Sequence, residues 1–310
     1  MKELLVLSGK GGTGKTAVTA SFAHLSHLDS DLPGAVFVDA DVDAANLDLL
    51  IGAAPLEEHD FQGGHIANID PELCITCGIC QEVCRFDAVG YTDFTAEFLV
   101  DPLGCEGCAA CYYECPVDAI SMLPRLSGHW FRSESRFGPL FHARLRPAQE
   151  NSGKLVSLVR EEGEKAAMDE GYPLLIVDGP PGIACPAIAS VTGVDLVLIV
   201  TEPTVSGLHD LERVGRLTAH FGVETLVCIN KADLYPAGAA KVEECCETLG
   251  LSLLGAIPFD ETVTQALVKG KPVTEYRPES KASEALRKLW TDVKHALGMP
   301  QSIGVASGGA

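Results

Sequence analysis

A glycine-rich loop near the N-terminus constrains the fold more than any other feature of the sequence. The loop follows an apolar run, Leu4–Ser8, and opens a segment with helical spacing of apolar residues, Thr16–Leu28. This strand–loop–helix context is the one in which such a loop binds phosphate, so the sequence predicts a P-loop rather than a chance glycine-rich turn. The loop fits G-x-x-x-x-G-K-[ST] and reads Gly9-Lys10-Gly11-Gly12-Thr13-Gly14-Lys15-Thr16.

Each kind of residue in the loop has an expected role. The glycines allow the backbone to pass close to phosphate, so that its N–H groups point inward. Lys15 is expected to reach the β- and γ-phosphates, and Thr16 is expected to offer its hydroxyl to Mg²⁺. The sequence therefore predicts a nucleoside triphosphate and Mg²⁺ as ligands.

The rest of the sequence alternates apolar runs with amphipathic segments. Buried strands separated by helices indicate an α/β fold with a mostly parallel sheet and helices on both faces. The expected helices include 154–168, 208–221 and 241–249. The expected strands after the first are Ala35–Asp39, Leu174–Asp178, Asp195–Thr201, Thr225–Asn230 and Leu253–Ile257.

Two cysteine quartets interrupt this pattern. Both have the spacing C-x-x-C-x-x-C-x-x-x-C, and the second repeats the first at an offset of 31 residues. In two-cluster ferredoxins the fourth cysteine of each run ligates the other cluster. We therefore expect two [4Fe–4S] clusters, because zinc leaves the repeated third cysteine unexplained and disulfides are rare in the expected compartment. The crossed ligand sets are Cys74, Cys77, Cys80 and Cys115 for one cluster, and Cys105, Cys108, Cys111 and Cys84 for the other.

These patterns predict a discontinuous architecture. Residues 1–62 and 124–298 are expected to form the P-loop domain, and 63–123 an inserted small α+β ferredoxin-like module. Within the P-loop domain, 124–151 reads as irregular, and 299–310 as a disordered tail. The last predicted helix has Leu286, Leu289, Trp290, Val293 and Leu297 on one face, which indicates docking on the sheet rather than on a membrane.

The amino-acid composition limits the classes of binding partner and the compartment that we expect. The formal net charge of −20 repels phosphate backbones and anionic lipid, so we expect neither nucleic-acid nor membrane binding. No N-terminal signal peptide is apparent, and the twelve cysteines favour metal binding in a reducing compartment. We therefore expect a cytoplasmic location.

Lys10 adds a second lysine to the loop, which reads K-G-G-x-G-K-T. This form resembles the deviant Walker A motif of the MinD/Mrp/ParA and nitrogenase-iron-protein class of P-loop ATPases. The resemblance implies that Lys10 crosses a nucleotide-sandwiched homodimer to the partner's phosphates. It further implies that Asp41 orients the attacking water, that Asp178 holds the Mg²⁺ shell and that Gly182 senses the γ-phosphate.

The segment Asn230-Lys231-Ala232-Asp233 is compatible with either adenine or guanine as the base of the bound nucleotide. In the resembled family an asparagine at this place reads adenine, whereas N-K-x-D is also the guanine-reading pattern of GTPases. The resemblance favours ATP, and the local motif keeps GTP open.

The resemblance extends to MinD-like ATPases with an inserted ferredoxin domain, and it implies ATP hydrolysis coupled to the clusters. The process coupled to hydrolysis is either electron transfer or metallocofactor assembly, each with an acceptor protein that the sequence does not identify. A spatial organiser with structural clusters is the alternative. Cys185 is expected either to be a small packed residue or to take part in metal or redox chemistry, whereas Cys228, Cys245 and Cys246 are expected to be buried.

Overall fold

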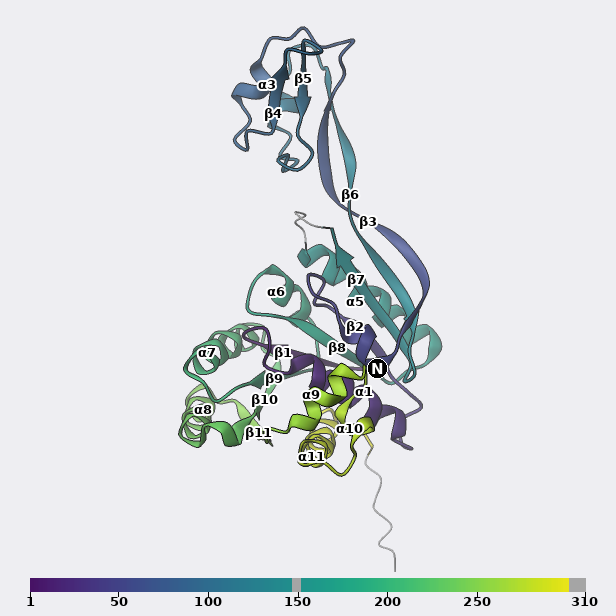
Figure 1. The fold of residues 1–310 in the computed structure, drawn as a ribbon, viewed down its shortest axis with the longest axis vertical. Helices are drawn as coiled ribbons and strands as arrows, with labels where there is room; N and C mark the ends of the chain where they lie inside the picture. The colour runs from purple at the N-terminus through teal and green to yellow at the C-terminus, as the bar shows by residue number, and fades with distance from the viewer. Residues whose placement is uncertain (147–151, 301–310) are drawn as a thin grey trace, which may run out of the picture. The chain divides into compact units, whose positions relative to one another are not determined.

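The apolar runs form the strands of one large sheet, described here from a computed structural model that covers residues 1–146 and 152–300 (Figure 1). The sheet has the strand order β11-β10-β9-β1-β8-β2-β7-β6-β3, and β4 and β5 form a separate hairpin. The strands are β1 (Lys2–Ser8), β2 (Val36–Asp39), β3 (Ala54–Ile69), β4 (Val89–Thr92), β5 (Glu97–Val100), β6 (Ile120–Glu134), β7 (Pro139–Leu145), β8 (Leu174–Pro181), β9 (Leu196–Thr201), β10 (Glu224–Asn230) and β11 (Ser252–Ile257).

Seven neighbouring strands, from β11 to β7, pair in parallel. The predicted mostly parallel α/β sheet is therefore confirmed. The helices between the strands are α1 (Lys15–Leu28), α2 (Leu47–Ile51), α3 (Ile79–Glu82), α4 (Ala110–Tyr113), α5 (Ser152–Glu170), α6 (Cys185–Val191), α7 (Val205–His220) and α8 (Pro236–Leu249). The last strand is followed by α9 (Glu261–Val268), α10 (Val273–Tyr276) and α11 (Lys281–Ala296).

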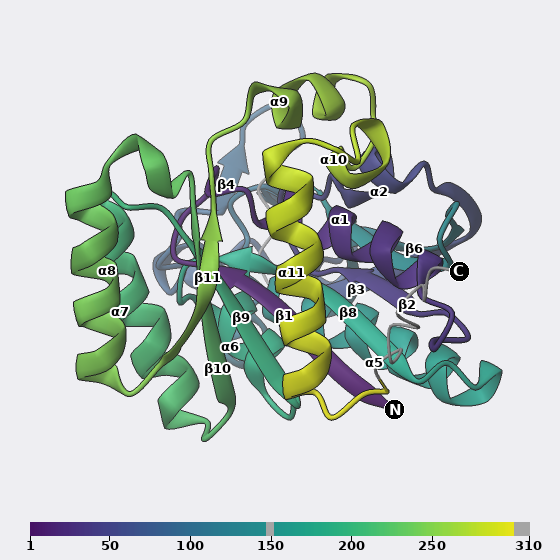
Figure 2. The same cartoon turned by 90° about the horizontal axis from the view of Figure 1, so that it is seen from below.

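Helices cover both faces of the sheet (Figure 2). Leu4 and Val6 of β1 belong to a core cluster with residues of α1 and α11, whereas Leu5 lies against Gly179 and so faces the other layer. All residues from Leu4 to Leu7 are fully buried, which explains why β1 reads as a continuous apolar run. The apolar face of α11 is buried on the sheet as predicted, and it consists of Leu286, Leu289, Trp290 and Val293. Leu297, directly after the end of the helix, is buried as well.

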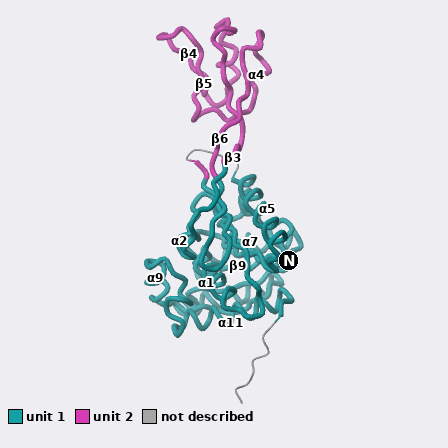
Figure 3. Tube along the Cα trace, turned by 90° about the vertical axis from the view of Figure 1, so that its right-hand side faces the viewer, with its two compact units in different colours: residues 1–59, 130–144, 152–310 teal, residues 60–129, 145–151 magenta. Residues whose placement is uncertain are grey.

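The described residues divide into two compact units (Figure 3). Unit 1 contains Met1–His59, Trp130–Arg144 and the chain from Ser152 onward, and unit 2 contains Asp60–His129 with the segment that begins at Leu145. The strands β3 and β6 run from one unit into the other. Residues 63–123, the predicted insert, lie within unit 2. No helix among the described residues is long and apolar enough to span a bilayer.

The prediction that residues 124–151 are irregular was wrong for most of that stretch. β6 extends to Glu134, and β7 follows after a tight turn in which Ser135 N–H bonds to the Gly138 carbonyl. The side chains of β6 are mostly half-buried or exposed and do not form an apolar run, and the short buried run of β7 is interrupted by His142. Residues 147–151 of that prediction, and 301–310 of the predicted tail, lie outside the described residues.

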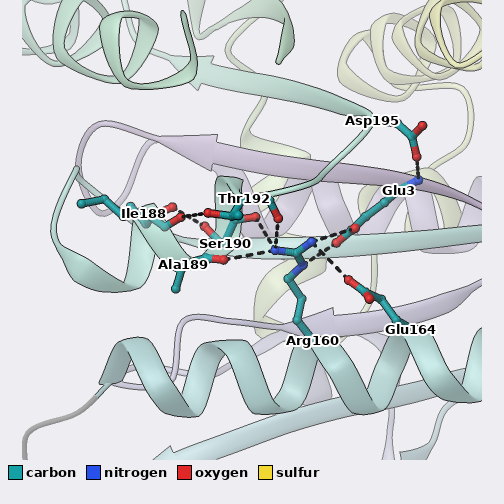
Figure 4. A network of polar contacts seen from close by, with 9 residues as sticks. Glu3, Arg160, Glu164, Ile188, Ala189, Ser190, Thr192 and Asp195 are labelled. Carbon is teal, nitrogen blue, oxygen red and sulfur yellow. Dashed lines mark hydrogen bonds and ion pairs between the residues drawn. The ribbon is translucent and has the colours of Figure 1, made fainter. Parts of the chain in front are cut away.

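A buried arginine joins three elements of unit 1 (Figure 4). Arg160 of α5 donates from Nε and Nη2 to the two carboxylate oxygens of Glu3 in β1, at 2.7 and 2.9 Å. Its Nη1 donates to three carbonyls at the end of α6, on Ala189, Ser190 and Thr192. Burial raises the pKa of Glu3 above its usual value even though Arg160 bonds to it.

We expect Arg160→Ala to lower the free energy of unfolding of unit 1 by about 3–5 kcal/mol, because it leaves the Glu3 carboxylate buried without its partner. Urea unfolding followed by circular dichroism measures the change. The matched control is Arg216→Ala, whose pair with Glu212 is exposed on α7 and is worth less than about 1 kcal/mol. Similar unfolding midpoints for the two variants would contradict the role given to Arg160.

Candidate functional site

The P-loop lies between the end of β1 at Ser8 and the start of α1 at Lys15, as the sequence predicts. Gly12 and Gly14 have φ angles of 81° and 96°, in the left-handed region that favours glycine. A Cβ atom on Gly14 would lie 2.3 Å from the Asn230 side-chain nitrogen, so the close approach of β10 also requires glycine there. The backbone geometry thus accounts for Gly12 and Gly14 of the motif.

A pocket of about 500 Å³ opens beside this loop. It combines the loop with the segment after β2 and with the end of β8, so residues far apart in sequence meet at one edge of the sheet. Its lining consists of Ser8, Gly11, Gly12, Gly14, Lys15, Thr16, Ala17, Asp41, Ala44, Asn46, Leu49, Leu50, Pro181 and Leu267.

Asp178 lies at the centre of the polar contacts beside the pocket. Its carboxylate is fully buried and lies 3.0 Å from Lys15 Nζ. It also accepts hydrogen bonds from the hydroxyls of Thr16 at 2.7 Å and Thr19 at 2.8 Å. The structure therefore brings together the lysine, the threonine and the aspartate that were predicted to serve phosphate and Mg²⁺, and it adds Thr19, which sequence reasoning missed.

Asp39, at the end of β2, organises the loop that carries Asp41. Its carboxylate accepts backbone N–H bonds from Asp41 at 3.1 Å and from Asn46 and Leu47 at 3.0 Å. Burial, together with the negative charge of Asp178, raises the pKa of Asp39 to about 7. Sequence reasoning missed this role, although the strand-end position of Asp39 was visible.

Asp41 itself is half-buried and lines the pocket. Burial raises the pKa of its carboxyl, and the positive charge of Lys15 opposes that rise. The carboxylate therefore lies within the electrostatic reach of the P-loop lysine.

Gly182 approaches the loop from β8. Its N–H bonds to the Ser8 carbonyl at 2.8 Å, and its φ of 86° favours glycine. Neither Gly182 nor Gly9 is among the residues that line the pocket. Gly9 is enclosed by α7, because a Cβ atom there would lie 2.2 Å from Asp210 Cβ.

Three side chains of the N-K-x-D segment form hydrogen bonds with other parts of unit 1. Asn230 Nδ2 donates to the Thr13 carbonyl at 2.7 Å, which ties β10 to the P-loop. Lys231 Nζ donates to Glu202 Oε1 at 2.6 Å. Asp233 Oδ1 accepts the Phe259 N–H at 2.6 Å, so one of its two carboxylate oxygens is engaged by the loop after β11.

Unit 2 repeats its local structure at the same offset of 31 residues as its cysteines. Thr76, Gly78 and Asp87 of the first half have positive φ, and so do the equivalent Gly107, Ala109 and Asp118 of the second half. The short helices α3 and α4 are equivalent as well. The duplication seen in the sequence is therefore a duplication of backbone conformation.

The two halves also bond to each other reciprocally. Asp70 N–H bonds to the Ala119 carbonyl at 2.8 Å, and the equivalent Asp101 N–H bonds to the Ala88 carbonyl at 2.7 Å. Each half thus contributes the segment after its fourth cysteine to the start of the other half. This exchange positions each fourth cysteine beside the opposite run.

Two pockets result, each lined by three cysteines of one run and the fourth cysteine of the other. Apolar residues complete most of both linings, and Phe98 and Ala67 occupy equivalent places. The cysteines of the first pocket are Cys74, Cys77, Cys80 and Cys115, and those of the second are Cys105, Cys108, Cys111 and Cys84.

The fourth cysteines share a further contact. Cys84 Sγ accepts the Ala88 N–H, and Cys115 Sγ accepts the Ala119 N–H, both at 3.3 Å. Across residues 1–146 and 152–300, no three cysteine, histidine, aspartate or glutamate side chains converge as a single metal ion would require. The four cysteines of each set line one pocket.

The remaining cysteines differ from one another in burial. Cys228, Cys245 and Cys246 are buried, as expected. Cys185 is the first residue of α6 and is exposed, so it is not the packed small residue that one interpretation expected.

Comparison with known proteins agrees with this architecture. The sequence matches the CobQ/CobB/MinD/ParA nucleotide binding domain over residues 4–273. It is 32% identical to an uncharacterized protein of Methanocaldococcus jannaschii, over 95% of this chain and 97% of that protein. A putative septum site-determining protein MinD of Oltmannsiellopsis viridis is 25% identical, over 88% of this chain and 69% of that protein.

Solved structures agree on the fold. The septum site-determining protein MinD in complex with Mg-ADP from Pyrococcus horikoshii aligns with a TM-score of 0.57 at 20% identity, over 96% of this chain and 97% of that chain. The cell division ATPase MinD of Pyrococcus furiosus aligns with a TM-score of 0.56 at 22% identity, over 95% of this chain and 98% of that chain. With the P-loop, its pocket and the parallel sheet, the match over residues 4–273 shows that the chain belongs to the CobQ/CobB/MinD/ParA family of nucleotide-binding domains.

Proposed function

We propose that the chain is an ATPase that acts as a nucleotide-sandwich homodimer and couples hydrolysis to two [4Fe–4S] clusters in unit 2. The coupled process is electron transfer or metallocofactor assembly with an acceptor protein. The observation that carries this proposal is the pair of cysteine pockets, each of which combines three cysteines of one run with the fourth of the other.

The chemistry of the pocket residues fits [4Fe–4S] clusters. Four thiols face each space, apolar side chains exclude water, and a backbone N–H already bonds to one sulfur in each pocket. When bound, such a cluster stores or passes one electron. The role of this chain's residues is to hold the clusters with eight thiolates and to link the two halves of unit 2, since each half supplies a ligand to both clusters.

The nucleotide site supports hydrolysis. Lys15 and the P-loop N–H groups would neutralise phosphate charge, and Thr16 and Asp178, which are hydrogen-bonded to each other, would hold Mg²⁺. Asp41 lines the same pocket, where a carboxylate can orient the attacking water. ATP is favoured over GTP, because one oxygen of Asp233 is already bonded to the Phe259 N–H and only the other remains for a guanine ring.

Chain connectivity supports coupling between the units. The loop that carries Asp41 leads through α2 into β3, which continues into unit 2. β7, which follows the returning strand β6 and ends where unit 2 begins again at Leu145, pairs with β2, so that His142 lies opposite Asp39. Arg144 Nη2 lies 3.0 Å from Asp48 Oδ2. A change in the Asp41–Asp48 loop with nucleotide state would therefore reach unit 2 through β3, which follows the loop in the chain, and through β7, which contacts it.

The test is an anaerobic purification followed by EPR of the dithionite-reduced protein with and without Mg·ATP. We expect two interacting [4Fe–4S]⁺ signals that change shape or position with ATP. Two signals that do not change with ATP would overturn the proposed coupling between hydrolysis and the clusters, but would leave the cluster assignment intact. Zinc in place of iron would overturn the cluster assignment.

A second candidate is a spatial organiser. The relative from Oltmannsiellopsis viridis is named as a septum site-determining protein, and the fold is that of MinD. In this role the clusters would be structural, so the EPR signals would not respond to Mg·ATP, and ATP would instead change the localisation of a fluorescently tagged chain in cells.

A further inference from the structure

Lys10 is already engaged within its own chain. Its Nζ lies 3.2 Å from Glu202 Oε2 and donates to Ser206 Oγ at 3.1 Å. The side chain is 32% exposed, so it is neither buried nor extended into solvent. If Lys10 is to reach a partner's phosphates, it must first leave these two contacts.

Glu202 is well placed to hold a cation. It follows β9 at the same edge of the sheet as the P-loop, and its side chain is only 14% exposed. Its second oxygen, Oε1, accepts the 2.6 Å bond from Lys231. Burial favours the neutral acid, but the hydrogen bonds from Lys231 and Lys10 outweigh it and hold the pKa of Glu202 below its usual value.

The backbone around Glu202 fixes both contacts. Thr204 begins α7 as its N-cap and accepts the Gly207 N–H at 3.0 Å. A Cβ atom on Gly207 would lie 2.2 Å from the Glu202 carbonyl oxygen, so this turn is tight enough to require glycine. The turn therefore presents the Glu202 carboxylate and the Ser206 hydroxyl together, next to the P-loop.

We propose that Glu202 is a positioning residue that holds Lys10 within its own subunit, and that the partner's nucleotide must displace this contact before the homodimer closes. The proposal rests on the proposed function, because it assumes that Lys10 acts across the dimer. Glu202 thereby sets the ATP concentration at which the subunits associate. Lys231 keeps the carboxylate in place after Lys10 has left, because it bonds to the other oxygen.

The test measures the concentration of a non-hydrolysable ATP analogue that gives half-maximal dimer, by sedimentation velocity on the full chain with its metal content matched. Partly exposed ion pairs contribute little free energy, so we expect Glu202→Gln to lower this concentration by about two- to fivefold. Turnover at saturating ATP should change less than that, because the contact is absent from the closed dimer. Ser206→Ala removes the second contact and should shift the concentration in the same direction.

Two controls separate the possible causes. Glu212→Gln removes one negative charge from α7 without touching Lys10, and it shows how much association gains merely from a net charge less negative than −20. An equal shift for Glu212→Gln and Glu202→Gln would overturn the proposal. Lys10→Ala tests the underlying assumption: dimer formation as in the unmodified chain would reject action across the dimer. Loss of the dimer with Lys10→Ala, but no shift with Glu202→Gln, would reject the holding contact alone.

Discussion

Cys115→Ser is expected to remove one of the two clusters and to leave the other, so that iron falls from about eight to about four atoms per chain. The reason is that Cys115 lines the pocket of Cys74, Cys77 and Cys80 rather than that of its own run. Iron analysis and EPR of the anaerobically purified variant measure the loss. Cys185→Ser is the matched control, since Cys185 is an exposed cysteine outside both pockets and its loss should leave the iron content unchanged.

Double variants distinguish crossed from uncrossed ligation. With crossed ligation, Cys77→Ser combined with Cys115→Ser removes ligands of one cluster only, and about four irons remain. Cys108→Ser combined with Cys115→Ser removes a ligand of each cluster, and both are lost. With uncrossed ligation, the first double variant would lose both clusters and the second would keep about four irons. That pair of results would reject the crossed assignment.

The sequence predicted the buried strands of unit 1 well because their apolar runs are continuous. β1, β8 and β9 are covered on both faces, so almost every side chain must be apolar and the strand is visible without alternation. β6 lacks that signature, and in β7 the buried run is short and interrupted by His142. Trp130 and Arg132 are partly exposed and His142 is buried against Ser133, so polar and aromatic residues occur throughout.

The P-loop was predictable because its chemistry is local. Glycine, lysine and threonine occur at fixed spacing within eight residues, and the motif carries its own flanking strand and helix. Contacts between distant segments were not predictable in the same way. The bond from Thr19 to Asp178 joins residues 159 positions apart, and the contact of Lys10 with Ser206 joins residues 196 apart.

The cysteine pockets were only partly predictable from the sequence. The spacing and the repeat allowed the crossed ligand sets to be written from the sequence, but the reciprocal bonds of Asp70 and Asp101 are a property of the folded module. Lone residues gave the least information. Cys185 has no repeat and no spacing partner, and only the structure distinguishes its exposure from the burial of Cys228.

Asp41→Ala is expected to lower ATP turnover by about 10²–10⁴-fold while nucleotide binding is retained. The carboxylate lines the pocket, and Lys15 and Thr16 remain in place to bind the phosphates and Mg²⁺ without it. Phosphate release at saturating ATP measures the loss, and equilibrium binding of a fluorescent ATP analogue measures retention. A variant with full turnover would reject Asp41 as the residue that orients water.

The neighbouring Asp43→Ala provides the control for this prediction. Asp43 carries the same charge on the same loop, but it is exposed and does not line the pocket. Asp43→Ala removes one negative charge from the loop, as Asp41→Ala does. It is expected to alter turnover by less than about threefold, because solvent screens an exposed charge. A comparable loss of turnover in both variants would mean that the charge of the loop, rather than the position of the Asp41 carboxylate, supports hydrolysis.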